Sequence, residues 1–133
     1  MAGRLQVRIV TPERPVFQGE ADSVVVPAHD GELGILPRHA RLLAALGVGE
    51  LRTTVDGTVH RFFVEGGFVQ VRADRVTVLC DRASRLEDLD PQAARAEAEA
   101  ARATHAADAA RLERRATIVE RVTRRSATSS SER

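Results

Sequence analysis

An abrupt change in composition after Ser84 is the feature that most constrains how this chain folds. All nine Gly, all four Phe and the single Cys lie in residues 1–84, whereas the remainder lacks Gly and is rich in Ala, Arg and Glu. Aromatic and β-branched residues favour strands, while Ala, Arg and Glu favour helices. The sequence therefore predicts a strand-forming module at 1–84, a helical module at 85–125, and a disordered Ser/Thr-rich tail at 126–133.

Apolar and polar side chains alternate along much of residues 1–84. Leu5, Val7 and Ile9 share one face of a predicted strand, and Cys80 extends a similar apolar face near the end of the module. Asp56-Gly57 separates two further runs and suits a two-residue type I′ turn. Many short strands with closely spaced turns predict an antiparallel β-sandwich, or flattened barrel, in which all four Phe serve the sandwich.

The second module has helix-start signals but no strong break. Asp90 is a suitable N-cap, Pro91 suits the first helical position, and Thr104 is a candidate N-cap for a second helix. Leu112, Ala116, Val119 and Thr123 then repeat at helical spacing to about Arg125. An antiparallel α-helical hairpin is our first interpretation. One long helix is the alternative, because no Gly or Pro interrupts the segment.

This hairpin is expected to be held weakly, because an interface between Ala side chains buries little apolar surface. Several pairs of like charges four residues apart also destabilise the second helix slightly. A basic, loosely docked helix suits an acidic partner, although a solvated basic face explains the pattern equally well. The arginines concerned are Arg111, Arg114, Arg115, Arg121, Arg124 and Arg125.

Composition excludes several kinds of function. All 20 basic residues are Arg, so Schiff-base and P-loop lysines are excluded. The net charge of +1 and the lack of Tyr and Trp argue against a nucleic-acid module built on residues 111–125. A single Cys permits no intramolecular disulfide. We expect neither a signal peptide nor a membrane span, which requires about 20 apolar residues.

His29, Asp30, Glu32 and His39 fall close together in a segment with several Gly and Pro, which predicts an irregular exposed loop. Its His and carboxylate groups are adequate ligands for zinc or iron, although the spacing of the His residues is not typical. The alternative function is therefore a small metal-dependent hydrolase that uses His29, Asp30 and His39. The apolar residues of the loop indicate instead a docking surface, or a plug for the end of the sandwich.

At this loop the sequence resembles the epsilon subunits of bacterial F-type ATP synthases. The resemblance rests on the VTPERPVFQGE segment at 10–20, on the run from Pro27 through DGELGILP to Leu43, and on FVEGGFVQV at 63–71. It covers about residues 4–125, and the glycine-containing loop is its most specific part.

The resemblance implies a non-catalytic subunit of the central stalk, or rotor, that couples proton-driven rotation to ATP synthesis. Its implied partners are the gamma subunit, the c-subunit ring and, in an extended state, the alpha/beta catalytic head, whose ATP hydrolysis the helical domain inhibits through the basic residues named above. The implied location is the cytoplasmic face of the cell membrane, reached only through the complex. The implied c-ring and gamma docking residues are Asp30, Gly31, Glu32, Leu33, Gly34, Ile35, Leu36, His39 and Leu42.

The chain departs from the family pattern at several positions. Ala28 and Arg38 stand where the family usually has Gly, and Arg41 stands in place of Pro. Some members bind ATP through an Asp-x-x-Arg-Ala motif, for which Asp90 and Arg95 are the candidates here. Because Arg95 comes two residues late and lies on a different helix face, we expect no cofactor.

Overall fold

The computed structural model describes residues 4–104 and 108–131, with side chains described as far as Arg125. The chain divides into two compact units, Met1–Arg85 and Leu86–Arg133. This division falls one residue after the compositional boundary at Ser84.

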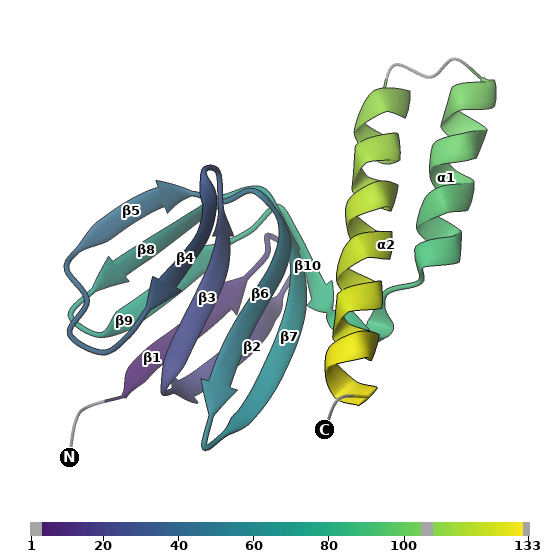
Figure 1. Cartoon of the computed structure of the whole chain (residues 1–133). Coiled ribbons are helices and arrows are strands. Elements are labelled where there is room, and N and C mark those ends of the chain that lie inside the picture. The colour runs from purple at the N-terminus through teal and green to yellow at the C-terminus, as the bar shows by residue number, and fades with distance from the viewer. Residues whose placement is uncertain (1–3, 105–107, 132–133) are drawn as a thin grey trace. The chain divides into compact units, whose positions relative to one another are not determined.

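Ten strands in the first unit form two five-stranded sheets, which confirms the predicted β-sandwich (Figure 1). Sheet A has the order β2-β1-β9-β8-β5, formed by Pro15–Ala21, Leu5–Val10, Arg75–Leu79, Phe68–Arg72 and Leu42–Ala45. Sheet B has the order β10-β7-β6-β3-β4, formed by Arg82–Arg85, Thr58–Glu65, Val48–Val55, Ser23–Ala28 and Gly31–Ile35.

One strand pair differs from the expected antiparallel arrangement. β1 runs parallel to β9, with Val7 opposite Val76, while the other described pairs are antiparallel. The two strands lie far apart in the sequence, so no hairpin signal connects them. The alternation of apolar and polar residues predicts which face of the sheet each side chain occupies. It does not distinguish parallel from antiparallel pairing.

The core lies between the two sheets and is built from the alternating side chains. Leu5 and Ile9 of β1 and Val64 of β7 are fully buried, and Cys80 is also buried. Phe62 packs its ring against Phe17 with a centroid separation of 5.5 Å. The predicted core face of β1 and the predicted core position of Cys80 are therefore confirmed.

Two turns show why residues 1–84 need their glycines. Asp56 and Gly57 both have positive φ, at 51° and 82°, as a type I′ hairpin between β6 and β7 requires. Gly67, with φ of 105°, lies so close to β9 that a Cβ atom there would overlap the carbonyl oxygen of Leu79. Gly67 therefore permits a close approach of two backbone segments where any other residue would force them apart.

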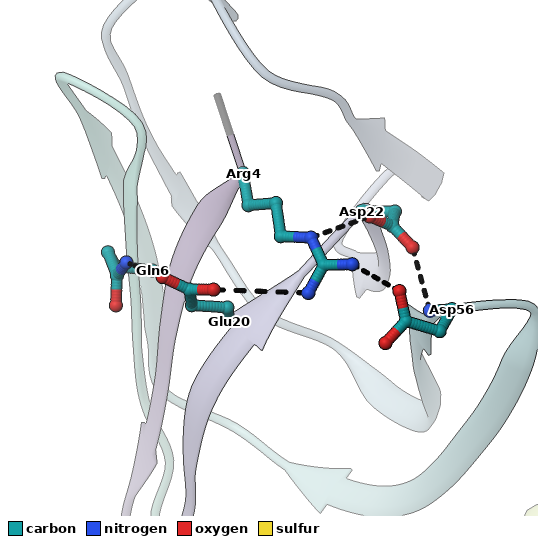
Figure 2. A network of polar contacts seen from close by, with 5 residues as sticks. All are labelled: Arg4, Gln6, Glu20, Asp22 and Asp56. Atoms are coloured by element: carbon teal, nitrogen blue, oxygen red, sulfur yellow. Dashed lines mark hydrogen bonds and ion pairs between the residues drawn. The ribbon is translucent and has the colours of Figure 1, made fainter. Parts of the chain in front are cut away.

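A polar network around Arg4 ties the two sheets together (Figure 2). The Arg4 guanidinium, at the start of β1, binds the carboxylates of Asp56, Asp22 (3.3 Å) and Glu20 (3.9 Å). Asp22 also accepts a 2.8 Å hydrogen bond from the Asp56 backbone N–H, and Gln6 donates one to Glu20. The hydrogen bond to Asp56 is the main reason why the pKa of Arg4 is raised. The network joins sheet A to the β6–β7 turn of sheet B.

The second unit contains a short 3₁₀ helix, Leu86–Asp88, and two α-helices, α1 (Pro91–Ala103) and α2 (Ala109–Ser131), which pack together as a hairpin (Figure 1). The hairpin interpretation is therefore confirmed over the single long helix. Asp90 caps α1 by accepting a 2.9 Å hydrogen bond from Gln92 N–H, as predicted.

Two local predictions for this unit are wrong. Thr104 ends α1 rather than starting the second helix, because its hydroxyl bonds back to the carbonyls of Ala100 and Ala101. The predicted disordered tail is helical as far as Ser131, since α2 continues without a break. Ser and Thr have only slightly lower helix propensity than other residues and do not stop a helix already under way. Residues 132 and 133 lie outside the described residues.

Candidate docking surfaces

The predicted docking loop is largely a regular strand. β3 and β4 form a tight hairpin in which Ala28 is opposite Gly31 and Val24 is opposite Ile35. The expectation of an irregular loop from 29 to 39 is therefore wrong for Gly31–Ile35, because edge pairing to β3 satisfies this backbone. Gly31 follows the His29-Asp30 turn with φ of 129°, a conformation that suits Gly.

The predicted docking residues fall into two groups, one packed against the core and one exposed. Ile35 is fully buried, and Leu33 and Leu42 pack partly against the core, so these three hold the hairpin on the sandwich. Ile35 is therefore not available for direct contact with a partner. The exposed positions of the set are Asp30, Gly31, Glu32, Gly34 and Leu36, of which Leu36 is 62% exposed.

Glu32 takes part in a ladder of charges across sheet B. Its carboxylate accepts a 3.0 Å hydrogen bond from Arg52, which also binds Glu50, and Glu50 in turn binds Arg61 at 2.7 Å. Burial alone would lower the pKa of Arg52, but the hydrogen bonds that its guanidinium donates to Glu32 and Glu50 outweigh burial and raise the pKa. Glu32 is half-exposed, so a partner meets a carboxylate already oriented by Arg52.

The segment after β4 is fixed to the β8–β9 turn. The backbone N–H of His39 donates to the Leu36 carbonyl at 3.2 Å, and that of Arg38 donates to the Asp74 carboxylate at 2.7 Å. Arg38 has φ of 69°, a left-handed conformation that favours Gly. Gly, which the resemblance described above implies at this position, would adopt this conformation without strain. It also places the Leu36–His39 turn beside the tip of sheet A.

The sequence left open a metal site at His29, Asp30 and His39. His29 lies in the β3–β4 turn, and His39 lies in the following turn with Nδ1 2.7 Å from the Ala40 carbonyl oxygen. Across the described parts of the chain, no group of three or more His, Cys, Asp or Glu side chains is placed to hold a metal ion. The hydrolase alternative has no support.

The arginines of α2 lie mostly on one exposed stripe. At 100° per residue, Arg111, Arg114, Arg121 and Arg125 fall within roughly 80° of one another, and all four are exposed. Arg124 is exposed beside this stripe and Arg115 is half-buried. The opposite face carries the predicted apolar residues, of which Leu112, Ala116 and Val119 are buried. Arg111 is also bound to Asp108 at 3.1 Å.

Arg95 joins the two helices, a role that sequence reasoning missed. Its guanidinium binds the carboxylates of Glu113 and of Glu120 (2.5 Å) and the hydroxyl of Thr117 (3.3 Å), all on α2. Hydrogen bonds to Glu120 and then Glu113 raise the pKa of Arg95. The seven-residue spacing of Glu113 and Glu120 places both on one face of α2. This spacing was the sequence signal that could have predicted a shared cation. Beside Arg95 lies a groove of about 540 Å³, also lined by Gln92, Glu99, Thr123 and others.

Comparison with known proteins identifies the family. Residues 4–86, more than half of the chain, match the family model described as "ATP synthase, Delta/Epsilon chain, beta-sandwich domain". The chain is 48% identical over 96 residues to the ATP synthase epsilon chain of Desulforamulus reducens, covering 72% of this chain and 73% of that one. It is 44% identical over 113 residues to that of Acidithiobacillus ferridurans, covering 85% and 80%.

Solved structures show the same fold. A chain of the Euglena gracilis mitochondrial ATP synthase, from a structure of OSCP, F1 and c-ring, matches with a TM-score of 0.69 at 19% identity, covering 91% of this chain and 78% of that one. A central stalk/c-ring structure from Tetrahymena thermophila matches with a TM-score of 0.60 at 16% identity, covering 91% and 97%. The family model and the bacterial relatives show that this chain belongs to the epsilon-chain family of ATP synthases.

Proposed function

We propose that this chain is a non-catalytic rotor subunit of an ATP synthase, which couples proton-driven rotation to ATP synthesis. The observation that carries the proposal is the family match over 4–86, on a sandwich with the same fold as subunits of solved ATP synthases. In this role the sandwich binds the gamma subunit and the c ring, and the exposed part of the β3–β4 hairpin around Glu32 supplies the c-ring contact. No helix among the described residues is long and apolar enough to cross a membrane. We propose that the complex holds the chain at the cytoplasmic face of the cell membrane.

The coupling role is tested by assembling the enzyme with and without this chain. Without it, we expect proton-driven ATP synthesis to fall to background while hydrolysis by the catalytic head persists, because no rotor subunit connects the head to the c ring. Assembly with the Glu32→Gln variant, which keeps the shape of the side chain but removes its charge, is expected to weaken coupling only partly. Full synthesis without the chain contradicts the proposal.

The helical unit is proposed to restrain ATP hydrolysis by meeting an acidic surface of the catalytic head. The exposed arginine stripe on α2 supports this role, because Arg binds carboxylates with paired, charge-assisted hydrogen bonds. Removing residues 89–133 from the assembled enzyme is expected to raise the hydrolysis rate several-fold and to leave synthesis intact. Unchanged hydrolysis would exclude the inhibitory role and leave the rotor role standing.

The hairpin is proposed to close without a nucleotide. Arg95, the candidate phosphate ligand, already binds Glu113 and Glu120, so a phosphate group would have to displace two carboxylates and then lie beside them. Calorimetric titration of the full chain with MgATP is expected to give no heat of binding at millimolar concentration. A saturable signal that the Arg95→Gln variant loses would contradict this proposal.

A further inference from the structure

Glu32 stands on an edge strand that gives its side chain little support. β4 is the outer strand of sheet B, and Glu32 lies opposite Pro27 of β3. The next residue on the same face of β4 is Gly34, and open space surrounds that position. A long carboxylate side chain in such surroundings has several accessible rotamers. Contacts from other strands must therefore decide where the Glu32 carboxylate lies.

Arg52 of β6 provides such a contact from two strands away. Register places Arg52 opposite Val25 of β3, so its bond to Glu32 crosses β3 diagonally and ties the edge strand to β6. The bond runs from Arg52 Nη1 to Glu32 Oε2 and is 3.0 Å long. Within the described part of the chain no other polar group binds Glu32. The second oxygen, Oε1, therefore keeps its capacity to accept hydrogen bonds.

Arg52 is itself held in place by a second carboxylate. Its Nη1 also donates to Glu50 Oε1 at 3.2 Å, and Arg61 of β7 donates to the same oxygen at 2.7 Å. The Glu50 side chain is only 9% exposed, and the Arg52 side chain is 25% exposed. Both residues belong to β6, which is bonded to a neighbouring strand on each side. The Arg52 guanidinium is thus fixed before a partner arrives, whereas Glu32 is half-exposed.

We propose that Arg52 is a positioning residue for the contact that Glu32 makes with the c ring. Arg52 fixes one carboxylate oxygen of Glu32 and leaves Oε1 for a basic or amide donor group of the partner. A side chain that is ordered in advance loses less conformational entropy on binding, which raises the affinity. This inference rests on the proposed function, which supplies the partner, and it adds a residue that acts through Glu32 without touching the partner.

The bond between Arg52 and Glu32 has a second physical interpretation with the opposite consequence. The positive charge of Arg52 could neutralise Glu32 and so compete with a cationic group of the partner. The geometry points to positioning, because Arg52 shares its charge with Glu50 and reaches Glu32 through a single hydrogen bond. Removal of Arg52 weakens binding if Arg52 positions Glu32, and strengthens binding if Arg52 competes with the partner.

The test measures how tightly the complex of the full chain with the gamma subunit binds the isolated c ring of the same organism. Glu32→Gln is expected to bind about 10-fold more weakly, because a charge-assisted hydrogen bond becomes a neutral one. Arg52→Gln is expected to bind about 5-fold more weakly, because the partner must then order a free carboxylate. Arg52→Lys keeps the charge and a donor for Glu32, so it is expected to recover part of the affinity.

A double variant separates positioning from a general loss of structure. In the Glu32→Gln background, Arg52→Gln is expected to cause little further loss, because no carboxylate remains to be positioned. A fall of the same size in both backgrounds would show that Arg52 only supports the fold, and would overturn the proposal. Arg82→Gln is the matched control, since it removes the same charge from an exposed position on β10 of the same sheet. This control is expected to bind as the unmodified chain does.

The remaining outcomes separate this inference from the proposed function. If Arg52→Gln binds as tightly as the unmodified chain or more tightly, while Glu32→Gln binds more weakly, the positioning role is wrong and the Glu32 contact stands. If Glu32→Gln binds as tightly as the unmodified chain, the Glu32 contact and the positioning role are both wrong, and the rotor role stands. If the unmodified complex does not bind the c ring, the proposed function fails as well.

Discussion

At the scale of single residues, Cys80 has a raised pKa in a pH range in which the chain has few other titrating side chains. Its thiol is buried at the end of β9, and burial, with a smaller contribution from the charge of Asp81, raises its pKa from 9.0 to about 12. The chain has no Lys and no Tyr, and Arg titrates only above about 12. Cys80 is thus the one side chain of the sequence that titrates between pH 9 and 12.

The raised pKa of Cys80 predicts how the stability of the chain depends on pH. The thiol stays protonated in the folded chain but ionises in the unfolded chain above about pH 9, so the unfolded state gains stability as the pH rises. The free energy of unfolding is expected to fall by about 1.4 kcal/mol per pH unit between pH 9 and 12. Urea denaturation at several pH values measures this slope. Cys80→Ala should abolish it, and an equal slope in that variant would contradict the assignment.

At Arg38 the unfavourable feature is the backbone conformation. A left-handed conformation costs an L-residue about 1–2 kcal/mol, and Arg38 adopts it at φ of 69°. Arg38→Gly should raise the free energy of unfolding by about 1 kcal/mol relative to Arg38→Ala, because Gly avoids the strain and keeps the N–H bond to Asp74. Thermal or chemical denaturation decides this, and a less stable Gly variant would exclude strain at Arg38.

At the scale of elements, the helical hairpin depends on small contacts. The buried residues of α1 are Ala94, Ala98 and Ala101, which allow close packing but contribute little hydrophobic free energy. Arg95 compensates by binding two carboxylates of α2 at once, in addition to the apolar contacts. The Arg95 cluster thus adds a polar contribution to a hairpin whose apolar contacts on α1 are small, so a substitution of Arg95 is expected to loosen it.

Arg95→Gln is therefore expected to open the hairpin more often, because Glu113 and Glu120 lose their shared cation. Backbone amides in α1 and α2 should exchange with deuterium several-fold faster, while those in β6 and β7 are unaffected. Arg102→Gln serves as the control on the same helix, since Arg102 is exposed and forms no ion pair within the described chain. Equal exchange in the two variants would show that Arg95 does not hold the hairpin.

At the scale of the whole molecule, a near-neutral net charge hides strongly basic local surfaces. The formal charge is +1, yet α2 presents a stripe of arginines and sheet A carries Arg8, Arg72 and Arg75 together. Surfaces of this kind steer and orient acidic partners even when the total charge is small. The proposed contact of the α2 arginines with the catalytic head is of this type.

Because the proposed contact with the head is electrostatic, it should respond to salt. In the assembled enzyme, raising the salt concentration is expected to relieve inhibition of ATP hydrolysis, since ions screen exposed charges beyond about 8 Å at physiological ionic strength. Arg114→Gln/Arg121→Gln/Arg125→Gln should raise hydrolysis several-fold at low salt and remove most of the salt response. The Arg82→Gln variant provides a charge control, and an unchanged salt response in the triple variant would rule out the stripe.

The sequence alone determined the two-module division, the sandwich, the helical hairpin, the core positions of β1 and Cys80, and the family. These follow from local periodicity, from turn chemistry at Asp56-Gly57 and from specific motifs, all of which are read within a few residues. Tertiary structure decided the parallel β1–β9 pair, the edge strand that replaced the predicted loop, the link from Arg95 to α2, and the bond from Arg52 of β6 to Glu32 of β4. Each of these joins residues distant in sequence, and pairing between distant segments depends on the whole fold rather than on any local pattern.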